Sequence, residues 1–306
     1  MPISNGNFTS MSVTEMTRRE LTAALAAPLL AAAAGASRVI DVAVHFYDTN
    51  RAQGVPWPRA TEPVLYKPSL PARYLEAIKP NRVDGVVAIE ASPWLEDNLW
   101  LLTLGDNHPL IRAVIGNIPP GHPDFRAALD RFAKHPLFRG IRIGAGALDA
   151  IFADSKRVSD IGFLSDRSLS LDVLVSAAAD YARVARLAMQ FPALRIVVGH
   201  LPLDDAAGFR QLADHPSVFA KVSGVVRRVN GNVPTDAAFY KRQLDELWSV
   251  LGAERLLFAS NWPTCDLIAP YPVVYQVIAD YMAGKPSAQL EAFFSLNAQR
   301  VYGLTA

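Results

Sequence analysis

The sequence predicts a single α/β domain folded as a (β/α)8 TIM barrel, preceded by an N-terminal export signal. Short β-branched runs alternate with longer stretches of helical periodicity from residue 39 to the C-terminus. Eight such runs lie within residues 37–306, a length typical of a barrel of eight strand–helix units. No internal repeat, low-complexity linker or shift in composition follows residue 37, so we expect one domain over residues 37–306.

The eight apolar runs are the expected strands. Most of them are nearly continuous in apolar residues, which is typical of parallel strands that are buried on both faces. They span residues 39–45, 84–90, 111–117, 140–144, 170–175, 194–200, 218–223 and 255–260.

Amphipathic helices are expected between the strands. Residues 236–251 carry an apolar stripe at helical spacing, and residues 95–106 and 180–190 show a similar pattern. Residues 289–302 are expected to form a C-terminal helix that covers the barrel. A doubly wound open sheet shares this alternation, but no Gly-rich phosphate loop follows the first run to support it.

The first 36 residues have the order of a secretory signal. Arg18 and Arg19 precede the uncharged stretch 21–34, and the small residues 34–36 resemble a cleavage site. Paired arginines are typical of twin-arginine signals, so we expect export, to the periplasm where there is one. The alternatives are an Ala-rich packing helix or an uncleaved anchor, although the apolar stretch is shorter than the roughly 20 residues of a membrane span.

The composition excludes several classes of function. A net charge of +1 without runs of like charge gives no support for a nucleic-acid or membrane-surface partner. Cys265 is the single cysteine, which excludes an intrachain disulfide and a zinc cluster built on thiolates. We therefore expect a small-molecule partner, no nucleic acid, and no membrane after signal removal; the sequence leaves a homo-oligomer open.

The chemistry of a barrel comes from the C-terminal ends of its strands. A long loop, residues 47–69, follows the first strand, and loops of that length in compact domains are usually functional. Its Trp57, and Trp94 after the second strand, are expected to line the mouth and stack on a ring. Buried cations are costly unless paired, so two histidines and two cations at one mouth indicate an anionic, carbonyl-bearing ligand. The polar residues at the strand ends include His45, Glu90, Arg142, His200, Lys221 and Asn261.

Several motifs resemble the amidohydrolase superfamily, in particular its amidohydrolase-related branch. IDVAVHFYD (40–48) resembles the Asp-x-His-x-His first strand, RIVVGHLP (195–202) the sixth-strand histidine motif, and LLFASNWPTC (256–265) the eighth-strand Gly-Ser-Asp-Trp-Pro motif. GVPWPRATEPVLY (54–66) is similar to the first loop of the sugar-lactonase-like members. The pieces occur in the family's order up to residue 304, and the branch includes 2-pyrone-dicarboxylate-lactonase-like proteins.

The resemblance implies a barrel that hydrolyses lactones, esters or amides, or in some relatives decarboxylates. Many members use one or two divalent metals, while the lactonase group includes members that need none. In that group the eighth-strand Asp acts as general base, histidines flank the carbonyl, and Arg or Lys binds a substrate carboxylate.

This sequence departs from the family pattern at two positions. The first histidine of the pair is Ala43, while the second is retained as His45. The eighth-strand aspartate is Asn261, and the sixth-strand histidine is retained as His200. A catalytic zinc is usually bound by about three protein ligands, and the matched positions supply two imidazoles and an amide oxygen. We therefore expect no firmly bound cofactor, with one divalent metal such as zinc as the alternative.

These departures favour a hydrolase with a degenerate metal and base site. The expected reaction opens a small lactone or ester, carboxylate- or sugar-derived, by histidine-assisted attack of water. His45, His200 and Asn261 are the expected catalytic residues. One alternative is a catalytically impaired barrel that binds a small anionic ligand; another is a metal-dependent hydrolase or decarboxylase. Substrate binding is expected from Glu90, Arg142, Lys221, Trp57 and Trp94.

Overall fold

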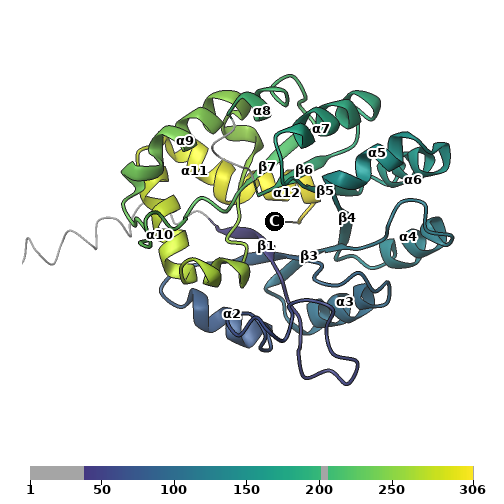
Figure 1. The fold of residues 1–306 in the computed structure, drawn as a ribbon, viewed down its shortest axis with the longest axis horizontal. Helices are drawn as coiled ribbons and strands as arrows, with labels where there is room; N and C mark the ends of the chain where they lie inside the picture. Colours follow the sequence, from purple (N-terminus) through teal and green to yellow (C-terminus); the bar gives the residue numbers. More distant parts are fainter. Residues whose placement is uncertain (1–37, 201–205, 306) are drawn as a thin grey trace, which may run out of the picture. The chain divides into compact units, whose positions relative to one another are not determined.

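The computed structural model describes residues 38–200 and 206–305, and the strands within them form one eight-stranded parallel sheet in sequential order. Figure 1 shows the helices arranged around these strands. The strands are β1 (Ile40–Val44), β2 (Gly85–Ile89), β3 (Ile111–Gly116), β4 (Phe138–Gly144), β5 (Ser170–Leu174), β6 (Ile196–Gly199), β7 (Val218–Val222) and β8 (Leu256–Phe258).

The helices lie between the strands, as the alternation predicts. The α-helices are α2 (Pro71–Ile78), α3 (Asp97–Asn107), α4 (Phe125–Ala133), α5 (Leu148–Phe152), α6 (Ser155–Asp166), α7 (Ala179–Gln190), α8 (Ala206–Arg210), α9 (Ala237–Leu251), α10 (Tyr271–Met282), α11 (Ser287–Glu291) and α12 (Asn297–Tyr302). The short helices are η1 (Ala145–Ala147), η2 (Ala253–Arg255), η3 (Thr264–Leu267) and η4 (Ala292–Leu296), the last a π-helix.

The last strand of the sheet lies beside the first, which excludes the doubly wound alternative. Val44 forms a parallel bridge with Trp262, just beyond β8. The backbone N–H of His45 donates to the carbonyl oxygen of Trp262 at 2.8 Å. An open sheet would leave β1 and β8 as free edges, whereas these contacts bring them together into a barrel.

The buried carboxylate of Asp41 also connects β1 to the segment that follows β8. Asp41 Oδ1 accepts from the backbone N–H of Ser260 at 2.9 Å, and Oδ2 accepts from the Ser260 hydroxyl at 2.5 Å and the Tyr74 hydroxyl at 2.9 Å. Burial raises the pKa of Asp41 to about 6 despite these donors. One side chain therefore ties β1, the segment after β8, and α2.

The apolar residues separate into two cores. The larger core lies between the strands and the surrounding helices, and the smaller one fills the barrel interior with residues such as Val42, Val87 and Leu257. Val301 and Tyr302 of α12 belong to the interior core, and α12 lies near the barrel centre in Figure 1. The predicted C-terminal cover over residues 289–302 is confirmed as α11, η4 and α12.

The strand predictions are correct in position. The fourth, 140–144, is too short because β4 begins at Phe138, and the others are slightly too long, mostly because the polar residues that end the runs belong to the loops. The export signal predicted for residues 1–36 lies outside the described residues and stays a prediction. Within the described ranges, 38–200 and 206–305, no helix is long and apolar enough to cross a membrane.

Candidate active site

A cavity of about 450 Å³ opens at the C-terminal ends of the strands. Six of the eight residues expected at the site line it, and each comes from a strand end or from the loop after β1. Its lining comprises His45, Trp57, Glu90, Ala91, Ser92, Pro93, Asn117, Arg142, Leu174, His200, Asn261 and Thr264.

His45 lies buried immediately after β1, and its environment identifies the nitrogen that carries the proton. Nδ1 lies 3.2 Å from the carbonyl oxygens of Ile89 and of Glu90. Carbonyl oxygens only accept hydrogen bonds, so Nδ1 is the protonated nitrogen. Nε2 therefore presents its lone pair toward the cavity, with the amide oxygen Oδ1 of Asn261 3.2 Å away. Because Oδ1 only accepts hydrogen bonds, the amide does not occupy this lone pair.

His200 follows β6 and faces a hydroxyl instead of carbonyl oxygens. Its backbone is in the left-handed region, with φ of 53°, and its Nδ1 lies 2.6 Å from the Ser223 hydroxyl oxygen. A hydroxyl both donates and accepts, so this contact fits either neutral tautomer of the imidazole. With the hydroxyl as donor, Nε2 of His200 carries the proton toward the cavity.

Both imidazoles are held neutral by their surroundings. Burial lowers the pKa of His45 to about 3, with further lowering by the positive charges of Arg142 and Lys221. Burial lowers the pKa of His200 to about 3 as well, helped by Lys221 and Arg142. At pH 7 the cavity is therefore lined by two neutral imidazoles.

Neutral buried histidines should make the protein sensitive to acid. In the unfolded chain each of these two histidines becomes protonated below about pH 6.5. In the folded state each stays neutral down to about pH 3. Folding stability should therefore fall by about 1.4 kcal/mol per pH unit for each histidine in that window. Asp41 acts in the opposite direction. Between about pH 6 and pH 3.8 it is protonated in the folded state and ionised in the unfolded chain, so its contribution to folding stability rises as the pH falls and offsets that of one histidine.

Urea unfolding at pH 6 and pH 4 should show a loss of about 3 kcal/mol in the wild type and little change in His200→Gln. Equal losses in the two proteins would contradict this assignment.

Arg142 supplies the positive charge that lines the cavity. Its Nε donates to Glu90 Oε1 at 2.8 Å, and Nη2 donates to the Glu90 carbonyl oxygen at 3.1 Å. Glu90 also accepts from the backbone N–H of Ser92 at 3.0 Å. Glu90 thus orients Arg142, and the remaining guanidinium N–H groups are left for a ligand.

Two expected site residues do not line the cavity. Lys221 is 3% exposed, and its Nζ lies 2.6 Å from Asp172 Oδ2, which also lies 3.2 Å from the Tyr302 hydroxyl. It precedes the last residue of β7, so its side chain is used inside the barrel instead of at the mouth. Trp94 is 39% exposed in the loop after β2, and neighbouring Pro93 lines the cavity in its place.

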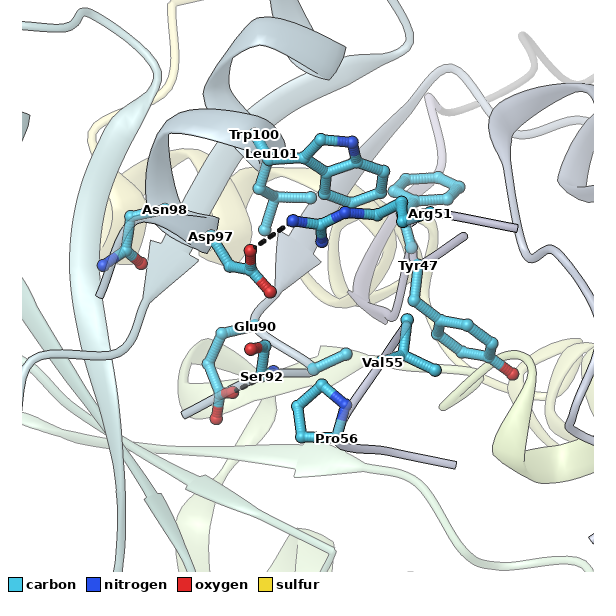
Figure 2. A pocket seen from close by; sticks show the side chains of 12 residues that line it. Tyr47, Arg51, Val55, Pro56, Glu90, Ser92, Asp97, Asn98, Trp100 and Leu101 are labelled. Atoms are coloured by element: carbon cyan, nitrogen blue, oxygen red, sulfur yellow. Dashed lines mark hydrogen bonds and ion pairs between the residues drawn. The ribbon is translucent and has the colours of Figure 1, made fainter. Parts of the chain in front are cut away.

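The long loop after β1 is anchored at three places. Tyr47 and Ser69 pair across its base, with N–H···O distances of 3.1 and 2.8 Å. Figure 2 shows Arg51 beside the Trp100 ring with an ion pair to Asp97, which measures 2.6 Å. The loop carries Trp57 to the cavity, where its ring meets His45 edge-on at a centroid distance of 5.9 Å.

The side chains at the mouth do not suit a firmly bound catalytic metal. Ala43 is buried in the interior core, and Asn261 offers a neutral amide that already faces His45. Within residues 38–200 and 206–305, no group of three His, Cys, Asp or Glu side chains is placed to hold an ion. Two imidazoles without an anionic partner form a weak set for zinc.

Two residues, one buried beneath the site and one lining it, were not identified from the sequence. Asp172 sits inside an apolar run, and that position alone indicates a buried acid in need of a partner such as Lys221. Ser223 was identified as the polar end of its strand, but its pairing with His200 is recognisable only once β6 and β7 are neighbours. Arg157 lines a side chamber of the cavity that depends on the course of two loops.

Comparison with known proteins agrees with this geometry. The amidohydrolase family model matches residues 40–304. L-fucono-1,5-lactonase from Burkholderia ambifaria is 27% identical over 74% of this chain and 81% of its own, and the L-fucono-1,5-lactonase of Burkholderia multivorans is 26% identical over 87% and 96%. A Burkholderia multivorans amidohydrolase crystallised with bound zinc shares the fold, with a TM-score of 0.77, 24% identity, and coverage of 88% of this chain and 100% of its own. The chain belongs to the amidohydrolase family.

Proposed function

We propose that the protein is a hydrolase that opens a small lactone, sugar-derived or bearing a carboxylate, by histidine-assisted attack of water. The observation that carries the proposal is that two buried histidines line one cavity, His45 with Nδ1 against a carbonyl oxygen and His200 with Nδ1 against a hydroxyl. The lactonase names of its relatives support the same reaction class.

In the proposed reaction each imidazole has one task. Nε2 of His45 accepts a proton from water as the water oxygen bonds to the lactone carbonyl carbon. Nε2–H of His200 donates to the developing oxyanion. Collapse of the tetrahedral intermediate breaks the ring C–O bond, and the His45 imidazolium returns its proton to the leaving alkoxide. The product is a hydroxy acid, which ionises in water.

The neutral state of the histidines suits these tasks. A neutral imidazole is a base at His45 and an uncharged donor at His200. A substrate carboxylate beside Arg142 would remove part of the positive field that lowers the pKa of His45, and would strengthen it as a base when substrate is bound. Asn261 is an amide and takes no proton itself.

The test is a panel of neutral sugar lactones and carboxylate-bearing lactones, assayed by proton release before and after treatment with a chelator. We expect turnover above the spontaneous rate that survives chelation, with less than one equivalent of metal by elemental analysis. One equivalent of zinc together with loss of activity on chelation would overturn the metal-free mechanism. No turnover, with a ligand still raising the melting temperature, would indicate the binding-only alternative.

A further inference from the structure

The active-site cavity continues into a second chamber that the strand-end residues alone do not reveal. This side chamber, of about 280 Å³, shares Glu90, Asn117, Arg142 and Leu174 with the main cavity. It extends past the ends of β3 and β4 toward α5 and α6. A ligand bound at His45 and His200 can therefore extend into it past Arg142.

The walls of the side chamber are mainly apolar. Pro119 and Pro120 line it from the loop after β3, and Ile143, Ile151 and Leu174 complete the apolar surface. Pockets of this kind bind aliphatic or ring carbons, with a few polar groups that fix orientation. A compact sugar lactone, with a hydroxyl on most carbons, would leave this surface unused.

The chamber contains a second arginine, Arg157, in the first turn of α6. Its Nη1 donates to the Pro120 carbonyl oxygen at 3.0 Å, and its Nε donates to Asp154 Oδ2 at 3.3 Å. The Arg157 guanidinium packs closely against the backbone at Gly121. A Cβ at position 121 would lie 3.0 Å from the guanidinium, so a glycine there leaves room for this approach. Two anchors fix the group, and the N–H bonds they leave are available to an anion.

The lining charges favour an anion at this end. Arg142 and Glu90 pair with each other, so neither adds a net charge to the chamber. Asp154 also accepts from the backbone N–H of Lys156 at 2.8 Å, so its charge is shared between Arg157 and the start of α6.

We propose that the substrate is a lactone with an apolar arm that ends in a carboxylate, an inference that rests on the proposed function. The ring lies in the main cavity, the arm lies in the side chamber, and Arg157 binds the terminal carboxylate. Arg157 is thus a specificity-determining residue for the length and charge of the arm.

Three matched δ-lactones test the proposal: one unsubstituted, one with an alkyl arm ending in a methyl group, and one with the same arm ending in a carboxylate. The wild type should prefer the carboxylate arm over the methyl arm by at least about tenfold in kcat/KM. Arg157→Gln should lower that preference by about tenfold or more, mainly through KM.

Filling the chamber gives an independent variant. Gly144 lines it in extended conformation, with φ of −79°, and a Cβ there would meet no atom within 4 Å. Gly144→Leu should lower kcat/KM for both arm-bearing lactones relative to the unsubstituted one by about tenfold. Gly146→Leu is the matched control, because Gly146 has equal space for a Cβ and does not line the chamber.

The outcomes separate this proposal from the proposed function. Turnover of the unsubstituted lactone with no preference for either arm, or equal effects of the Gly144 and Gly146 variants, would overturn the side-chamber assignment and leave lactone hydrolysis standing. If no lactone is turned over, the side-chamber assignment is tested by calorimetry, which measures binding of the ring-opened product that carries the carboxylate arm. Weaker binding to Arg157→Gln and Gly144→Leu than to wild type would support the chamber, and equal binding would overturn it.

Discussion

Replacement of His45 or His200 by alanine should lower kcat for lactone hydrolysis by at least about 100-fold. His45→Ala removes the lone pair that takes the proton from water, and His200→Ala removes the N–H that stabilises the oxyanion. Each should act on kcat far more than on KM, because neither holds the substrate in the ground state. Initial rates across substrate concentration, corrected for spontaneous hydrolysis, measure the effect.

The Ser223 hydroxyl provides the control for the role of His200. Ser223→Ala leaves the imidazole in place and removes the group that holds its proton on Nε2. We expect kcat to fall by a smaller factor, about tenfold, with KM little changed. Unchanged turnover in His200→Ala would remove the proposed mechanism. An effect of Ser223→Ala equal to that of His200→Ala would indicate a structural role for the pair.

Asp172→Ala should destabilise the protein by about 3–5 kcal/mol. The side chains of Lys221 and Asp172 are 4% and 3% exposed, so removal of the carboxylate leaves a buried ammonium without its partner. The Tyr302 hydroxyl of α12 would lose its acceptor as well. Urea unfolding at pH 7 measures the change in the free energy of unfolding.

Two further variants make this expectation specific. The exposed pair of Lys241 and Asp245, 64% and 42% exposed, is the matched control, and Lys241→Ala should cost less than about 1 kcal/mol. Replacing both buried partners, by Asp172→Leu with Lys221→Met, should recover much of the loss. A cost for Asp172→Ala similar to that of Lys241→Ala would show that Lys221 reaches water.

The barrel was predictable because its signal is repeated eight times along the chain. Continuous apolar runs mark buried parallel strands whatever their register, and the polar residue that ends each run falls at the mouth by topology alone. His45, His200 and Asn261 were identified in this way. The same argument misplaced Lys221, which lies one residue short of its strand end and pairs with Asp172 inside the barrel.

The remaining features of the site depend on contacts between segments distant in sequence. The protonated nitrogen of His45 is decided by two carbonyl oxygens at the end of β2, and Nδ1 of His200 meets the hydroxyl of Ser223 just beyond β7. The chamber at Arg157 depends on how the loop after β3 meets the start of α6. No pattern of residue types along the chain encodes these distances.

The contact that closes the barrel also fixes the proposed base. The backbone N–H of His45 donates across the junction to Trp262, while the His45 side chain faces the cavity. A fluctuation that separates β1 from β8 breaks this hydrogen bond and moves His45 away from Asn261, which follows β8. Amide hydrogen exchange at His45 therefore reports how often the two sides of the site come apart.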